Sequence, residues 1–297
     1  IQLEKPNHLR FAGSRPSKEN SRTNNPANWF GSLSGTQKRI LFWIRFFPFR
    51  TNLLSAQPAY PGFLLMESSL LELVGIGKRF GFRQVLHEIN LTLNDGEFVL
   101  LLGNNGAGKS TLLRILCLLM NPNAGEMHHR NIPIKEQRNT WLKQIGALSH
   151  ESRFYNDLTA RENLKIYGSL YDKSGLDHRI EEVLEQCNLI HAANLPVRTF
   201  STGMSKRLMI GRLILLEPKF LILDEPFTGL DQNSLDWFKN YLKNFHQNGG
   251  SVMLVTHQHE LGLELANRVL FLHKKSLLHD LKADSLNEED CKAILNG

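Results

Sequence analysis

The sequence predicts an α/β fold built on a parallel sheet, and two patterns carry this prediction. Three continuous apolar runs of strand length stand at residues 98–102 (FVLLL), 220–223 (FLIL) and 252–255 (VMLV). Segments with helical spacing of apolar residues separate them. A strand in which every residue is apolar is typical of a parallel sheet covered on both faces. We therefore expect the three runs to form the central sheet, alternating with helices.

Two further strands are expected ahead of the central sheet. They cover residues 70–74 and 89–93, and the turn Asn94-Asp95-Gly96 closes the second. Between residues 158 and 216 the spacing becomes helical instead, which indicates a helical insertion. One domain with such an insertion fits the length of the chain from Met66 onward.

The helical insertion carries two local signals. Thr159 and Glu162 form the pattern of a capping box, so a helix is expected to begin there. Ile180, Val183 and Leu184 share one helix face with Cys187, which predicts that Cys187 belongs to the core.

The chain has 297 residues and a formal net charge of +6, and that charge belongs to its front segment. Residues 1–65 hold nine Lys or Arg against two Glu, a net charge of +7, which leaves −1 for the other 232 residues. The body therefore gives no charge-based reason to expect a nucleic-acid partner. The front segment is interpreted as a disordered or non-native extension, with a transit peptide or a membrane-surface segment at residues 40–49 as alternatives.

Cysteine usage and hydropathy exclude several classes of protein. Cys117, Cys187 and Cys291 lie far apart without a CxxC pair, so neither a disulfide framework nor a thiolate zinc site is indicated. The longest apolar stretch, residues 40–49, contains Arg45 and Pro48 and is shorter than the roughly 20 residues of a spanning helix. His128 and His129 are expected in a polar loop, and His259-Glu260 at the start of a helix; we assign no structural zinc.

A glycine-rich loop directly after the run FVLLL matches the phosphate-binding pattern GxxxxGK[ST]. Glycines let successive backbone N–H groups point at a phosphate, and the following helix adds the positive end of its dipole. Lys109 would reach the β- and γ-phosphates of a nucleotide, and Ser110 would ligate Mg²⁺. The predicted nucleotide-binding residues here are Gly103, Asn104, Asn105, Gly106, Ala107, Gly108, Lys109, Ser110 and Thr111.

Two carboxylates follow the run FLIL. Asp224 is expected to hold the magnesium through water, and Glu225 to orient and deprotonate an attacking water. Upstream, Ser201 and the Gly203 amide stand at the start of an apolar helix, a position that favours an anion. Downstream come Thr228-Gly229-Leu230-Asp231 and then His257.

Taken as a set, these residues resemble the ATP-binding subunits of ABC transporters over residues 68–275. FSTGM (200–204) occupies the position of the family's LSGGQ signature. LDEP (223–226) corresponds to its second acidic motif, and TGLD (228–231) to its dimer-contact loop. His257 stands for its switch histidine. The resemblance implies a P-loop NTPase fold with a parallel core sheet, a small antiparallel β subdomain and a helical subdomain at about 150–216, all within residues 66–297.

The resemblance also implies a site shared between two subunits. In a head-to-tail homodimer or pseudo-dimer, Ser201 and Gly203 would contact the γ-phosphate bound to the partner. Phe80 would stack on adenine, where the family commonly has Tyr. His150 stands where a Gln usually touches magnesium, which would make that contact sensitive to mild acid. Met204 replaces the signature Gln and is expected to weaken geometric control without abolishing activity.

The implied activity is ATP hydrolysis with Mg²⁺, with Glu225, His257 and Lys109 as catalytic residues. Transport is favoured, because 232 residues leave no room for tandem domains or long coiled-coil insertions. The implied partners are integral membrane permease subunits, contacted near residues 150–172 at the cytoplasmic face of the cell membrane, with no direct nucleic-acid binding. The wording of the motifs resembles haem-exporting ATPases of cytochrome c biogenesis. Exporters of drugs, lipids or polysaccharides, a soluble non-transport ABC ATPase and a nonhydrolytic subunit stay open as alternatives.

Overall fold

Six strands form the central sheet, in the order β10–β9–β3–β8–β7–β6. The computed structural model describes residues 69–149, 154–171 and 175–296, so the expectations for residues 1–65 and for His150 lie outside it. Neighbouring strands run parallel except at the β9–β10 edge, which is antiparallel. The strands are β3 (Phe98–Leu102), β6 (Ile145–Leu148), β7 (Phe220–Asp224), β8 (Ser251–Val255), β9 (Arg268–His273) and β10 (Ser276–Lys282).

The three apolar runs form the middle of this sheet, as β7, β8 and β3. Alternate side chains of each strand enter two different cores: in β3, Phe98 and Leu100 belong to one, and Val99 and Leu101 to the other. Helices cover both faces, so every position is buried and no polar alternation marks the strand. The predicted parallel sheet is confirmed, with β6, β9 and β10 as strands that the sequence prediction did not include.

A second, four-stranded sheet is antiparallel, in the order β2–β1–β4–β5. The strands expected at 70–74 and 89–93 are parts of a long hairpin, in which Leu71 pairs with Leu93 and Phe80 with Arg83. The expectation of a polar loop at His128 and His129 is wrong, because both residues lie in β4 and pair with β1. The strands are β1 (Leu71–Phe80), β2 (Arg83–Leu93), β4 (Ala124–His129) and β5 (Ile132–Pro133).

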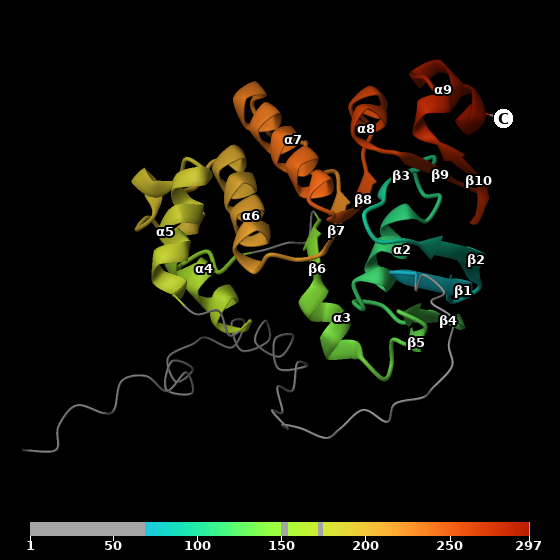
Figure 1. The fold of residues 1–297 in the computed structure, drawn as a ribbon, viewed down its shortest axis with the longest axis horizontal. Helices are drawn as coiled ribbons and strands as arrows, with labels where there is room; N and C mark the ends of the chain where they lie inside the picture. Colours follow the sequence, from blue (N-terminus) through green and yellow to red (C-terminus); the bar gives the residue numbers. More distant parts are fainter. Residues whose placement is uncertain (1–68, 150–153, 172–174, 297) are drawn as a thin grey trace, which may run out of the picture. The chain divides into compact units, whose positions relative to one another are not determined.

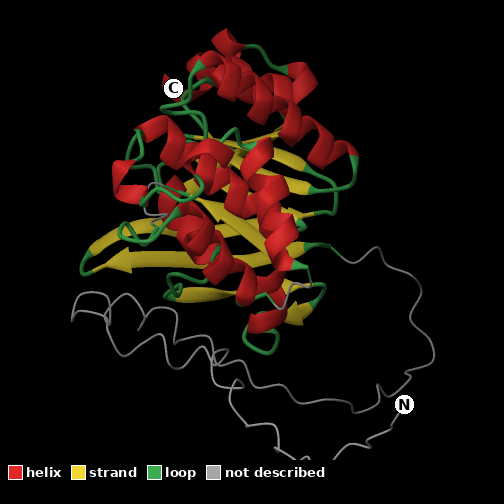
Figure 2. Ribbon diagram, turned by 90° about the vertical axis from the view of Figure 1, so that its left-hand side faces the viewer, coloured by secondary structure: helices red, strands yellow, loops and turns green. Residues whose placement is uncertain are grey.

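Three helices occupy the interval of the expected insertion: α4 (Ala160–Ser169), α5 (Leu176–Gln186) and α6 (Thr202–Leu216). They pack on one another and lie on the opposite side of β6 and β7 from the antiparallel sheet (Figure 1). Figure 2, seen from the side of these helices, shows them in front of the strands. The capping box of Thr159 and Glu162 is confirmed, and Cys187 is buried in the core. The boundaries of the domain and subdomain stay predictions.

The remaining helices surround the sheets. They are α2 (Lys109–Leu116), α3 (Arg138–Gln144), α7 (Gln232–Gln247), α8 (His259–Leu265) and α9 (Glu288–Asn296). Helix α8 begins at His259, as expected. In the parts of the chain that the structure describes, no helix is both long and apolar enough to cross a membrane.

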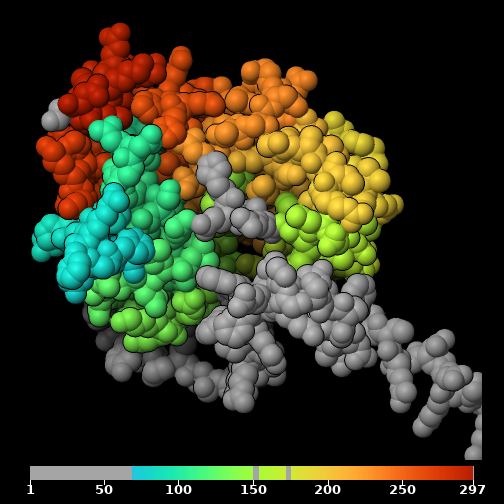
Figure 3. Space-filling view, turned by 180° about the vertical axis from the view of Figure 1, so that it is seen from behind, coloured from blue at the N-terminus to red at the C-terminus, as the bar shows by residue number. Residues whose placement is uncertain are grey.

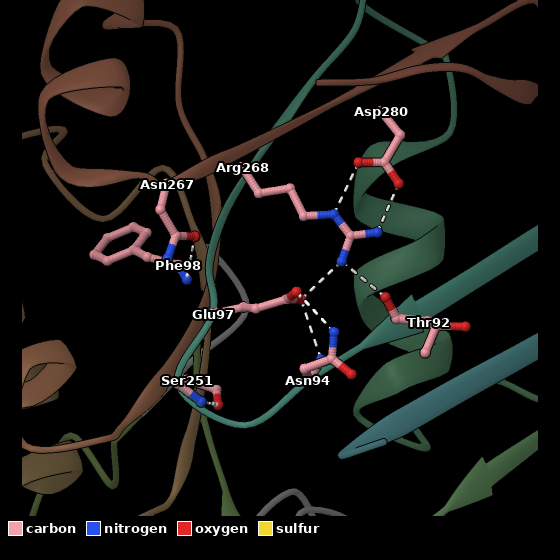
Figure 4. A network of polar contacts seen from close by, with 9 residues as sticks. Thr92, Asn94, Glu97, Phe98, Ser251, Asn267, Arg268 and Asp280 are labelled. Atoms are coloured by element: carbon pink, nitrogen blue, oxygen red, sulfur yellow. Dashed lines mark hydrogen bonds and ion pairs between the residues drawn. The ribbon is translucent and has the colours of Figure 1, made fainter. Parts of the chain in front are cut away.

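Arg268, the first residue of β9, ties the two sheets together at the end of β3 that lies away from the phosphate loop (Figure 4). Its guanidinium contacts Glu97 at 2.7 Å and Asp280 at 2.6 Å, and it donates to the carbonyl of Thr92 at 2.8 Å. Thr92 belongs to β2 and Asp280 to β10. In Figure 3 the C-terminal part of the chain, in red, lies against the first described residues, in cyan. This network joins strands β9 and β10 of the central sheet to β2 of the antiparallel sheet.

Candidate nucleotide-binding site

The phosphate loop joins β3 to α2 and is held by two strands. A Cβ on Gly103 would lie 2.5 Å from the carbonyl oxygen of Leu272 in β9. Gly108 has φ +115°, and a Cβ there would meet Leu86 Cδ2 at 2.7 Å and Val85 O at 3.0 Å in β2. Glycine is therefore needed at both ends of the loop for its backbone to pass this close to its neighbours.

Lys109 curls back over the loop. Its Nζ donates to the carbonyl oxygens of Gly103 at 2.5 Å and Asn104 at 3.3 Å. Burial lowers the pKa of Lys109, and the nearby carboxylates of Glu225 and Asp224 oppose this shift. The ammonium group thus stands between the loop backbone and the acidic strand end, where an anionic phosphate would find it.

A cavity of about 570 Å³ opens beside this loop. It brings together the tip of the β1–β2 hairpin, the phosphate loop, the end of β7 and the segment after β8. Most of the predicted site residues line it, together with Arg83, Val85 and Val255, which the sequence prediction did not include. The full lining is Phe80, Arg83, Val85, Asn105, Gly106, Gly108, Lys109, Ser110, Thr111, Asp224, Glu225, Val255 and His257.

Three loop residues predicted to bind nucleotide do not line this cavity. The backbones of Gly103 and Asn104 accept from Lys109, and the Asn104 side chain donates to the carbonyl of Leu295 in α9 at 2.8 Å. Ala107 packs against the core beneath the loop. These residues shape the loop, and a nucleotide contact of their own remains a prediction.

Glu225 occupies a constrained position immediately after β7. Its φ is +50°, in the left-handed region that residues with a side chain rarely adopt, and its N–H donates to Val255 O at 2.9 Å. Only 14% of its side chain is exposed, and its buried Oε1 accepts no hydrogen bond from the described residues. His257 Nε2 lies 3.5 Å away, on a side chain that is 61% exposed. A buried carboxylate oxygen that lacks a donor is suited to accept a bond from a bound water.

The donors for a divalent cation are also present. The hydroxyl of Ser110 and the carboxylate of Asp224 both line the cavity, and these hard oxygen ligands are the type that Mg²⁺ prefers. His150, the third predicted metal-site residue, lies outside the described residues. The residues present therefore fit a magnesium ion held with a nucleotide.

Ser201 and Gly203 lie apart from this cavity in the single chain. Ser201 is the exposed N-cap of α6, where its Oγ accepts from the Met204 amide at 3.2 Å. Neither residue is part of the cavity lining. In the single chain, the N-terminus of α6 at Ser201 is therefore separate from the cavity beside the phosphate loop.

Lys206 is a site residue that sequence reasoning missed. It lies in α6, is 7% exposed, and its Nζ donates to the carbonyl oxygen of Glu225 at 2.9 Å. Burial lowers its pKa, while Glu225 and Asp224 oppose the shift. The available signal was its spacing, because Lys206 stands four and seven residues before the buried Ile210 and Leu213.

The cysteines do not contribute nucleophiles to the site. All three are buried, and burial raises the pKa of Cys117 and of Cys187 to about 12. At neutral pH both therefore remain thiols.

The family model and the curated relatives that match this chain point to one family. The family model described as "ABC transporter" matches residues 86–228. An uncharacterized ABC transporter ATP-binding protein, YdbJ of Bacillus subtilis, is 33% identical over 77% of this chain and 75% of its own length. The cytochrome c biogenesis ATP-binding export protein CcmA of Escherichia coli is 36% identical over 59% of this chain and 83% of its own. The Nod factor export ATP-binding protein I of Bradyrhizobium diazoefficiens is 29% identical over 75% and 74%.

Solved structures agree with these relatives. The dimer of the ATP-binding cassette MJ0796 in a post-hydrolysis state, bound to ADP and Pi, superimposes with a TM-score of 0.66 at 26% identity. The superposition covers 72% of this chain and 98% of the MJ0796 chain. Fold, cavity and relatives together show that this chain belongs to the ABC transporter family, as an ATP-binding domain.

Proposed function

We propose that the chain is the ATP-hydrolysing subunit of an ABC exporter, and that this exporter is the haem exporter of cytochrome c biogenesis. The observation that carries the hydrolytic activity is the buried Glu225 Oε1 beside the phosphate loop, which accepts no hydrogen bond from the described residues and has His257 Nε2 3.5 Å away. The resemblance to CcmA supports the choice of haem. The Nod factor export relative supports another exporter, of a drug, lipid or polysaccharide, as the alternative.

In this proposal each polar group of the cavity has one task. The loop amides and Lys109 neutralise charge on the β- and γ-phosphates. Glu225 orients a water and takes its proton as the water oxygen attacks the γ-phosphorus, so that the bond to ADP breaks and phosphate is released. His257 holds the γ-phosphate and the water in line. Ser110 and Asp224 would hold Mg²⁺, which supplies further charge neutralisation; the exposed ring of Phe80 would stack on adenine.

The same proposal requires two copies of the domain. Ser201 and Gly203 lie outside the chain's own cavity, so they would complete the site of a partner subunit. The MJ0796 dimer supports this arrangement. Closure and reopening of the dimer would then act on permease subunits at the cytoplasmic face of the membrane, near residues 150–172.

Phosphate release by the purified protein tests the enzymatic part. We expect Mg²⁺-dependent hydrolysis of ATP that Lys109→Ala reduces at least about 10²-fold, because the charge opposite the phosphates is lost. Lys219→Ala removes an exposed lysine beside β7 and is the matched control, expected to keep wild-type turnover. Binding of ATP without phosphate release by the wild type would instead identify a nonhydrolytic subunit.

Co-purification tests the transport part. A tagged chain expressed in its own cell is expected to bring down an integral membrane protein. Recovery of nucleic acid or ribosomal components in its place would contradict transport and favour a non-transport ABC ATPase. Identifying the captured membrane protein, and the cargo that it carries, distinguishes haem from the other exported classes.

A further inference from the structure

Lys206 and Arg207, two consecutive basic residues of α6, contact the two ends of the loop at residues 225–231. Lys206 Nζ donates to Glu225 O at 2.9 Å, at the start of the loop. Arg207 donates through Nε to Ser234 Oγ at 2.7 Å and pairs with Asp231 Oδ2 at 2.5 Å, at its end. Asp231 is the N-cap of α7 and accepts from the Ser234 amide. The segment 225–231 is thus held at both ends by one helix.

Lys206 contacts the backbone of Glu225, whose conformation is unusual for a residue with a side chain. With φ at +50°, the residue departs from the strand, and the direction of its carboxylate depends on this bend. The N–H side is fixed by Val255 O in β8, and the C=O side by Lys206. A buried ammonium group has to keep such a partner, because leaving it unpaired in the interior is costly.

Ser201, the residue expected to meet the nucleotide of a partner subunit, is the N-cap of the same helix α6. Lys206 lies five residues further along the same helix. A shift of α6 when the partner's ATP is captured would therefore move the group that fixes Glu225. Since Glu225 lines the chain's own cavity, one helix touches both shared sites of the dimer.

We propose that Lys206 is a positioning residue that couples helix α6 to Glu225. Capture of the partner's nucleotide at the N-terminus of α6 would then align Glu225, the general base of the chain's own site. This inference rests on the proposed function. It assigns Lys206 no contact with ATP or magnesium. Lys206 acts through the Glu225 main chain, so replacing Lys206 should lower turnover more than nucleotide affinity.

The test compares Lys206→Met, Lys206→Arg and the control Lys219→Met. Met keeps the apolar stem but removes the ammonium group, and Arg restores a cation with donors. We expect Lys206→Met to lower kcat about tenfold, to change KM and the affinity for a fluorescent ATP analogue less than about threefold, and to reduce the Hill coefficient for ATP toward one. Arg should recover kcat to within about threefold of wild type, and Lys219→Met should match wild type.

Two further readouts separate positioning from stability. Amide hydrogen exchange in residues 225–231 should be faster in Lys206→Met, while Tm falls by less than a few degrees. An unchanged kcat, or a loss of kcat that follows Tm and that Arg does not recover, would overturn the coupling. If the wild type itself releases no phosphate, the proposed function fails separately, and exchange in residues 225–231 still decides whether Lys206 fixes this loop.

Discussion

At the scale of single residues, the site depends on positions with an unusual backbone conformation. Gly108 combines φ +115° with two close neighbours, Leu86 and Val85. Glu225 combines a left-handed backbone with a buried carboxylate. Both are constrained by strands outside the phosphate loop, which explains why a short motif functions only when the correct sheets surround it.

We expect Gly108→Ala to weaken ATP binding at least about tenfold, because the new methyl group must displace Leu86 and move the loop. The matched control is Gly249→Ala, at φ +85° with no atom near the added Cβ. It carries the backbone strain without the clash and should cost only about 1 kcal/mol of unfolding free energy. Titration with a fluorescent ATP analogue checks both variants, and equal affinities in the two would contradict the argument.

Several residues that line the cavity were predictable from sequence, since Lys109 belongs to the glycine-rich motif that follows β3, and Asp224 and Glu225 stand at the end of β7. Lys206 was not predicted, because its contact is with a backbone carbonyl, and its spacing to buried apolar residues marks only its burial. The same holds for Arg83 and Val85, which line the cavity only because the β1–β2 hairpin lies beside the phosphate loop.

At the scale of elements, β3, β7 and β8 were predictable because both of their faces are buried and each contains a continuous apolar run of four or five residues. Strand β10 (SLLHDLK) is a partly exposed antiparallel edge, and its mixed composition gives no such pattern. Strand β4 (AGEMHH) is polar, and its pairing with β1 decides its structure instead. Where tertiary pairing determines the element, local composition does not reveal it.

Arg268→Met should destabilise the chain by about 1–3 kcal/mol, because Glu97 and Asp280 lose their shared cation at the junction of the two sheets. The pair is partly exposed, which keeps the value below that of a fully buried pair. Arg198→Met, which removes an exposed ion pair to Asp157, is the control and should cost less than about 1 kcal/mol. Denaturant unfolding measures both, and equal losses would refute a structural role for the network.

His129 in β4 predicts a pH dependence of stability. Burial lowers its pKa, with Gln137 partly opposing, so the unfolded chain binds the proton more tightly than the folded one. Its contribution is therefore fully present above about pH 6.5 and is lost as the pH falls below that value. His129→Phe should reduce the loss between pH 6.5 and 5.5 by up to about 1.4 kcal/mol per pH unit.

Unfolding curves at several pH values check this expectation. His178→Phe is the control, because the His178 side chain is 83% exposed. The dependence of unfolding free energy on pH should differ between the two variants only below about pH 6.5. A wild-type slope in His129→Phe would show that this histidine does not titrate on unfolding.

At the scale of the whole molecule, the cavity and the N-terminus of α6 are separate features of the single chain. The phosphate loop with Glu225 lines one cavity, and Ser201 caps α6 outside that cavity. The positive net charge of the full sequence belongs to residues 1–65, so it does not describe the ATP-binding body. In the proposed function, local groups of the loop bind the polyphosphate, and a second subunit would complete the site.

The most direct test of this account is Glu225→Gln, assayed for turnover, ATP binding and dimerisation together. The variant removes the base and keeps the size of the side chain. We expect ATP affinity within about threefold of wild type, phosphate release lowered at least about 10²-fold, and an ATP-bound dimer that accumulates on size-exclusion chromatography. Near-normal phosphate release by Glu225→Gln would contradict the account.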